Sequence, residues 1–184
     1  MNDPHQFEAF MRDYQNMVYT TAYRLLSDEA ESQDIAQEVF LRAYQHFEEI
    51  KNSGTAGGWL KTVTRNLCLN HLSRHRSRWS LFSELASGRR DASDRDDIED
   101  FLPAGEPEYP QLDTEAQRQV LAAALDKLPR DQRIPLVLFH IEEMSYAEIA
   151  KSLKVSLAKV KINIHRGRLS LRRILAASPE CRMA

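Results

Sequence analysis

The segment SYAEIAKSLKVSLAKVKINIHRGRLSLRR, which begins at Ser145, constrains the fold more than any other part of the chain. Ser145 and Glu148, three residues apart, form the pattern of a capping box, which predicts the start of a helix. Apolar residues then recur at helical spacing until Lys154 and Val155, where a tight turn is expected, and Ser156 is placed to cap a second helix. Two short helices joined by a tight turn are typical of a helix-turn-helix.

The second helix of this segment has two chemically different faces. At about 100° per residue, the residues expected to face inward are Leu157, Val160, Ile164 and Leu171. The opposite side is rich in Lys and Arg, which neutralise phosphates. Four residues on or beside it can donate hydrogen bonds to base edges in a major groove: Lys161, Asn163, His165 and Arg166. Ile162 also points outward, where it fits a thymine methyl group or a neighbouring protein surface equally well.

The rest of the sequence predicts further helices and almost no strand. Apolar residues recur at helical spacing over residues 7–21, and a second helix is expected to begin near Asp28 and to include Phe47. A third is expected to begin near Trp59 and to direct the Trp59–Val63–Leu67 face into the core. Helical spacing resumes at Val120, and Asp131 is placed to cap another helix. The predicted fold class is therefore all-α.

Charge alternates along the chain. Residues 50–83 carry six Lys or Arg and no acidic residue, and residues 151–184 carry nine basic residues and one acidic residue. Residues 84–114 instead hold six Asp, four Glu, three Pro and two Gly, which predicts a flexible acidic linker. We therefore expect two small helical domains, residues 1–83 and 115–184, each with a basic working surface.

Several other classes of protein are disfavoured. Cys68 and Cys181 belong to no CxxC pair, so neither a disulfide framework nor a zinc site is expected. Without a signal peptide or a long apolar segment, the chain is expected to be cytoplasmic and not inserted in a membrane. No known catalytic motif occurs, and His71 and His75, one helical turn apart, lack an evident third ligand. We therefore predict no enzyme, cofactor or metal.

Two blocks cover about two thirds of the chain: ESQDIAQEVFLRAYQHF followed by GGWLKTVTRNLCLNHLSRHR, and ALDKLPRDQRIPLVLFHIEEMSYAEIAKSLKVSLAKVKINIHRGRLSLRRIL. In this order they resemble the extracytoplasmic-function (group IV) sigma factors of bacterial RNA polymerase, in the sigma-70 family. The first resembles the promoter-melting domain, region 2, and the second the −35-reading domain, region 4. The resemblance implies a protein that binds core polymerase and directs initiation through −10 and −35 elements.

The resemblance also implies partners and their contact residues. Region 2 is expected to dock on the clamp helices of the largest polymerase subunit through Asp34, Gln37, Glu38 and Leu41. The implied −10 contacts are Lys61, Arg65, Asn66, Asn70, Arg74 and Arg76. The implied −35 contacts are Arg133, Lys159, Lys161, Ile162, Asn163, His165, Arg166 and Arg168, with Arg133 and Arg168 on phosphates. Region 4 is expected to contact the flap of the second-largest subunit. An inhibitory anti-sigma factor, which would hold the protein at the inner membrane face, is a further expected partner.

The chain departs from the family pattern in two places. Ala158 and Lys159 stand where Gly-Thr is frequent, and the loop over residues 48–58 is longer, Gly-rich and without the usual aromatic residue. The base preferences are therefore left open. Two other hypotheses also remain open. A stand-alone helix-turn-helix regulator would bind duplex DNA without polymerase, and an adaptor that binds only protein would show little salt-dependent DNA affinity.

Overall fold

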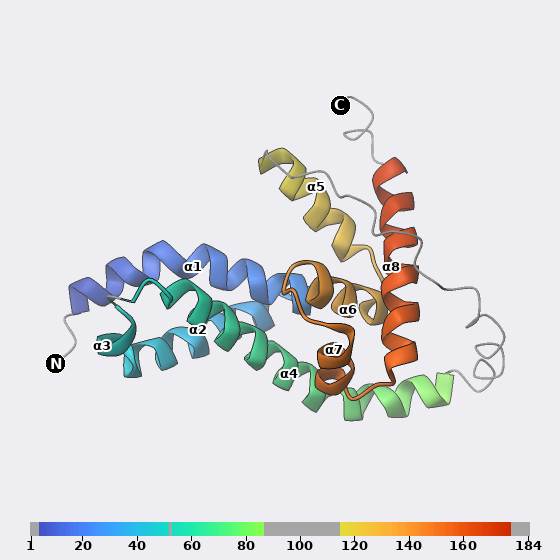
Figure 1. The fold of residues 1–184 in the computed structure, drawn as a ribbon, viewed down its shortest axis with the longest axis horizontal. Helices are drawn as coiled ribbons and strands as arrows, with labels where there is room; N and C mark the ends of the chain where they lie inside the picture. Colours follow the sequence, from blue (N-terminus) through green and yellow to red (C-terminus); the bar gives the residue numbers. More distant parts are fainter. Residues whose placement is uncertain (1–3, 52, 87–114, 178–184) are drawn as a thin grey trace. The chain divides into compact units, whose positions relative to one another are not determined.

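The computed structural model describes residues 4–51, 53–86 and 115–177, and the side chains of residues 75–86 and 115 are outside this description (Figure 1). The chain divides into two compact units, Met1–Arg74 and His75–Ala184. Throughout the described ranges the regular secondary structure is α-helix, which confirms the predicted all-α class.

The first unit contains α1 (Pro4–Leu26), α2 (Glu29–Gln45), α3 (Phe47–Ile50) and the beginning of α4 (Ala56–Ala86). The predicted start of α2 is confirmed, because the Asp28 side chain accepts a hydrogen bond of 2.9 Å from the Glu31 N–H. The prediction that Phe47 continues this helix is wrong. Helix α2 ends before His46, and Phe47 is the first residue of the short α3, where it is 1% exposed.

The core of the first unit lies mainly between α1 and α2, where Val18, Leu25 and Val39 are completely buried. At one end of this core the Phe47 ring meets Phe7 and Phe10 edge-on, with ring centroids 5.1 Å and 5.4 Å away. Edge-to-face packing is favourable for aromatic rings, so these contacts fix α3 against α1. The bend at His46 thus places a large aromatic ring in the core.

The buried face of α4 differs from the predicted one by one residue. Leu60, Thr64 and Cys68 are completely buried, whereas Trp59, Val63 and Leu67 are only partly buried. The sequence predicted that the Trp59, Val63 and Leu67 face enters the core, because these residues are all apolar whereas the other set contains the polar Thr64. However, the Thr64 hydroxyl donates a 2.7 Å hydrogen bond to the Leu60 carbonyl, which satisfies it within its own helix and lets it enter the core.

Helix α4 continues to Ala86, so the first three residues of the predicted acidic linker, 84–86, are helical. The rest of that segment, residues 87–114, lies outside the described residues, as does the side chain of Arg76.

The second unit contains α5 (Glu115–Asp126), α6 (Arg130–His140), α7 (Tyr146–Leu153) and α8 (Leu157–Ala177). Helix α8 packs against the other three, and Leu138, Ile149 and Ile164 form the centre of this core (Figure 1). Asp131 does not cap α6 as predicted, because Pro129, two residues earlier, is the N-cap and the helix begins at Arg130. The Asp131 carboxylate lies in the first turn of α6, where its negative charge interacts favourably with the helix dipole.

The helix-turn-helix is confirmed in detail. The Glu148 N–H donates to Ser145 Oγ at 3.3 Å, and the Ser145 N–H donates to Glu148 Oε2 at 2.9 Å, which completes the capping box. Lys154 adopts a left-handed conformation that ends α7, and Ser156 Oγ accepts from the Lys159 N–H at 3.2 Å.

The inward face of α8 is only partly as predicted. Val160 and Ile164 are 1% exposed, but Leu157 is 44% exposed. Leu157 lies about 60° around the helix from Val160 at the helix end, so it falls at the edge of the packed face.

Helices α6 and α8 make a close backbone approach at Gly167. A Cβ atom there would lie 3.2 Å from the Gln132 carbonyl oxygen and 3.6 Å from Leu136 Cδ2. We expect Gly167→Val to lower the free energy of unfolding of the second unit by about 1–3 kcal/mol, because the two helices must separate. Hydrogen exchange of α6 and α8 amides in the full chain measures this change. Ala176→Val, on the exposed side of α8, is the control, and equal effects of the two changes would contradict the close approach.

Candidate nucleic-acid interface

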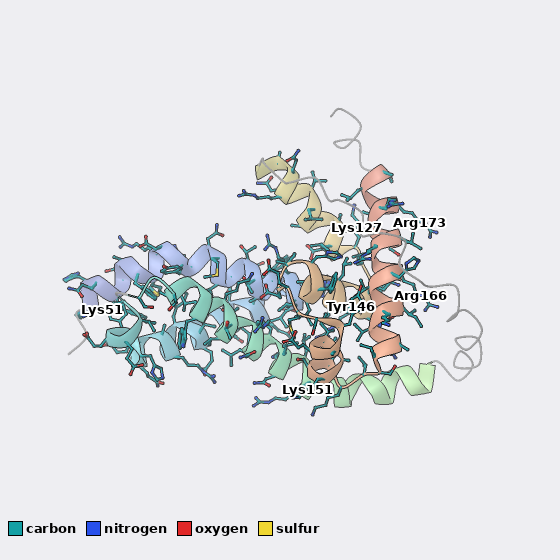
Figure 2. All side chains as sticks on the ribbon, viewed as in Figure 1. Lys51, Lys127, Tyr146, Lys151, Arg166 and Arg173 are labelled. Atoms are coloured by element: carbon teal, nitrogen blue, oxygen red, sulfur yellow. The ribbon has the colours of Figure 1, made fainter. Side chains whose placement is uncertain are left out.

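The exposed side of α8 carries most of the predicted −35 contacts. Lys159, Lys161 and Arg166 are exposed, whereas Ile162, Asn163 and His165 are partly exposed. Figure 2 shows Arg166 and Arg173 directed away from α6 and α7. The structure therefore separates a packed side of α8 from a basic side that remains accessible to a polyanion.

Arg133 does not belong to this surface. The side chain lies in α6 and the residue is 5% exposed, among the buried residues of the second unit. A phosphate contact requires an accessible guanidinium, so the burial of Arg133 argues against the predicted role. This burial was not evident from the sequence, since a charged residue in a first helical turn is ordinarily exposed.

Arg168 lies beside the basic side of α8, but its guanidinium contacts two residues of α6. Its Nε–H donates to His140 Nε2 at 3.1 Å, and its guanidinium carbon lies 5.5 Å from the centre of the Phe139 ring. Arg168 is thus tied to the end of α6, which the sequence did not indicate because His140 and Arg168 are 28 residues apart.

The predicted −10 contacts fall on two sides of α4. Asn66, Asn70 and Arg74 are exposed and follow each other at intervals of four residues, so they share one side. Lys61 and Arg65 are partly buried and lie on another side, and Arg65 Nε is buried without a hydrogen-bond partner among the described residues. The structure therefore brings together three of the six predicted residues as an accessible polar row.

Trp59 is only partly buried, so it is not the fully packed core residue that the sequence predicted. Its ring is partly exposed and lies 6.0 Å from the His46 ring, between centroids, beside a surface groove of about 600 Å³. Asn66 follows Trp59 after seven residues, or two helical turns, so both lie on the same side of α4. A partly exposed aromatic ring on the same side of a helix as exposed amides can stack on an unpaired base. The apolar spacing alone had suggested a core residue.

The predicted polymerase-docking stripe forms an exposed row on α2. Asp34 and Gln37 are exposed, and Glu38 forms an ion pair with Arg42 at 2.8 Å. Leu41 is 62% exposed, more than any other large apolar residue that the structure describes. Leu41 also lines two grooves, one toward α4 and one of about 950 Å³ between α1 and α2 that is lined largely by apolar side chains. An exposed leucine at the edge of a groove lined largely by apolar side chains gives a partner protein apolar surface to cover.

The loop before α4 is held by local contacts. Lys51 Nζ lies 2.7 Å from Glu48 Oε2 and 5.8 Å from the centre of the Phe47 ring. The hydrogen bond from Lys51 holds the pKa of Glu48 below its ordinary value. Lys51 therefore anchors one end of the Gly-rich loop that the sequence singled out.

The described residues contain no group of three or more His, Cys, Asp or Glu residues placed to hold a metal ion. His71, one of the two histidines considered for such a site, has its Nε2 atom 3.0 Å from Glu31 Oε2 and so links α4 to α2. Among the helices that the structure describes, none is long and apolar enough to cross a membrane.

Family models match both units. The model of sigma-70 region 2 matches residues 10–78, and the model of sigma-70 region 4 matches residues 118–171. The first match includes the α2 stripe and the exposed row on α4, and the second includes the helix-turn-helix. A region 2 followed by a region 4 defines the sigma-70 class of proteins.

Curated relatives give the family within this class. The ECF RNA polymerase sigma factor SigW from Bacillus subtilis is 30% identical over 174 residues, which cover 94% of this chain and 90% of SigW. The ECF sigma factor SigE from Mycolicibacterium smegmatis is 36% identical over 171 residues, which cover 92% of this chain and 62% of that relative. The chain belongs to the ECF family of RNA polymerase sigma factors.

A solved structure of the sigma factor RpoE from Bartonella quintana, in complex with the anti-sigma factor NepR, is also similar. It is 20% identical, with a TM-score of 0.47, and the match covers 94% of this chain and 98% of that one.

Proposed function

We propose that this protein binds core RNA polymerase and directs transcription initiation at promoters that it selects through their −10 and −35 elements. The observation that carries the proposal is the basic, accessible side of α8 within a complete helix-turn-helix. The exposed Leu41 on a separate unit supports it, because a DNA-binding module that acts alone does not require a second protein-binding surface.

The second unit reads the −35 element. The N-terminal half of α8 enters the major groove, and its exposed cations supply salt-dependent affinity. Lys161 and Arg166 donate to base edges or phosphates, with Asn163 and His165 between them. Ile162 contributes an apolar contact in the same groove. This unit also contacts the polymerase flap.

The first unit holds the −10 element and favours its separated strands. Strand separation forms and breaks no covalent bond, but it requires a surface that binds unpaired DNA better than duplex DNA. The exposed row of Asn66, Asn70 and Arg74 supplies polar and charged contacts, and Trp59 supplies a stacking surface beside them. The polymerase performs the chemistry, so the protein itself is not an enzyme and uses no cofactor.

The stripe of Asp34, Gln37, Glu38 and Leu41 docks on the clamp helices of the largest polymerase subunit. We place region 2 in residues 1–83 and region 4 in residues 115–184, with an acidic linker between them. The protein acts in the cytoplasm, where an anti-sigma factor competes for these surfaces.

Binding measurements with and without polymerase separate this function from its rivals. The protein alone should bind duplex DNA weakly, because its two DNA surfaces are correctly spaced only when both units are docked on polymerase. A labelled duplex that carries a responsive promoter should therefore bind tightly only when the protein and core polymerase are combined. Tight binding by the protein alone would favour a stand-alone regulator, and binding to polymerase without any DNA preference would favour an adaptor.

A further inference from the structure

A hydrogen bond joins the end of α6 to the middle of α8. Arg168 Nε–H donates to His140 Nε2 at 3.1 Å. His140 is the last residue of α6 and is exposed, whereas Arg168 is partly exposed. The contact therefore lies at the edge of the α6–α8 interface, where solvent protons can reach the imidazole.

Aromatic rings support the guanidinium in the same place. Arg168 lies over the Phe139 ring, at 5.5 Å from its centre, and Phe139 stacks on Tyr146 of α7 with ring centroids 4.6 Å apart. The His140 ring is edge-on to Phe139 at 4.8 Å. A guanidinium over an aromatic face is an attractive arrangement, so Arg168 is held by a ring below it and by an acceptor beside it.

The hydrogen bond depends on the protonation state of His140. A neutral imidazole can accept at Nε2, but a protonated one has a donor at both nitrogens and carries a positive charge. Protonation therefore replaces an attraction with two cations that face each other. Arg168 on α8 contacts His140, and Tyr146 on α7 stacks on the Phe139 ring that the His140 ring meets. Glu142 and Glu143 follow His140 by two and three residues, and His165 and Arg172 lie about one turn from Arg168 on α8.

We infer that neutral His140 positions Arg168 against α6 and that protonation of His140 releases Arg168 toward DNA. In the held state Arg168 Nη2 is buried without a hydrogen-bond partner among the described residues, so this end of the guanidinium is not offered to a phosphate. Release adds one mobile cation beside the basic side of α8. This inference rests on the proposed role of α8 in DNA binding, and His140 is a positioning residue rather than a DNA contact.

The first test uses the free full-length protein without DNA. The Arg168 Nε–H nuclear magnetic resonance signal is assigned by its loss in R168K. Its protection factor is the exchange rate of an exposed Arg Nε–H at the same pH divided by the measured rate, and it should lie well above one near pH 8. It should fall toward one near pH 5.5, below the usual titration range of histidine. In His140→Gln the amide oxygen accepts at any pH, so protection should persist at both values. In His140→Lys the side chain cannot accept a hydrogen bond, so protection should be absent at both pH values. A wild-type protection factor that is the same at both pH values, or one that His140→Lys leaves high, would overturn the inference.

The second test measures promoter binding by the complex with core polymerase. Release of Arg168 should add one phosphate contact, so the slope of log affinity against log salt should steepen by about 0.9 between pH 8 and pH 5.5. His140→Gln should abolish this pH-dependent change in slope. His165→Gln should abolish only the part of the change that protonation of His165 itself contributes. Equal pH dependence in wild type and His140→Gln would contradict the inference. If the resonance result holds but no DNA binds under any condition, the proposed function fails and the positioning of Arg168 stands.

Discussion

Replacing Lys161 and Arg166 together with alanine should weaken promoter binding by the polymerase complex by about 2–6 kcal/mol, since one base or phosphate contact on a reading helix contributes about 1–3 kcal/mol. Both side chains are exposed on α8, whose core contacts come from the buried Val160 and Ile164, so the fold should tolerate their loss. The effect should combine lower affinity with a shallower salt dependence, because two cations no longer displace counterions from DNA.

The measurement is a promoter titration by the complex at several salt concentrations. Lys127→Ala is the control, because it removes one exposed positive charge that follows α5 and does not belong to the reading helix α8. It should change affinity by less than about 0.5 kcal/mol. Unchanged promoter affinity in the double variant would remove Lys161 and Arg166 from the DNA surface.

Replacing Leu41 with Asp should weaken binding of this protein to core polymerase by about 2 kcal/mol or more, as expected when a charge is placed at the centre of a protein interface. Leu41 is 62% exposed, so it contributes little to the core of the first unit. The unfolding of the isolated protein should therefore be nearly unchanged, which separates a docking defect from a folding defect.

Fluorescence anisotropy of labelled protein titrated with core polymerase measures this affinity. Ala9→Asp introduces the same charge at an exposed position of α1 that does not line the groove between α1 and α2, and it should bind normally. Normal binding by Leu41→Asp would place the polymerase interface elsewhere on the first unit.

The parts of the fold that depend on local chemistry were predictable from the sequence. The Ser145–Glu148 capping box and the Ser156 cap are each formed by residues three positions apart, so both can be recognised from the sequence alone. The start of α2 at Asp28 is of the same kind. In each case a side chain satisfies a backbone N–H that the helix itself leaves unpaired.

The parts that depend on packing between helices were not predictable. The face of α4 that enters the core contains Thr64, whose hydroxyl is satisfied by its own helix, so a count of apolar residues selected the Trp59 face instead. The burial of Arg133 and the engagement of Arg168 by His140 both arise where α6 meets other helices. Leu41 was assigned to an interface through family resemblance, since its spacing alone is also that of an ordinary solvated face.

The central claim is that this protein gives core polymerase its promoter preference, and run-off transcription on genomic DNA fragments tests it most directly. Reactions with bacterial core polymerase should yield new discrete transcripts only when the protein is added, and their start sites should share −35 and −10 sequences. The Lys161 and Arg166 double variant should reduce these transcripts. Failure to produce any transcript with a core polymerase that a known ECF sigma factor activates would contradict the claim.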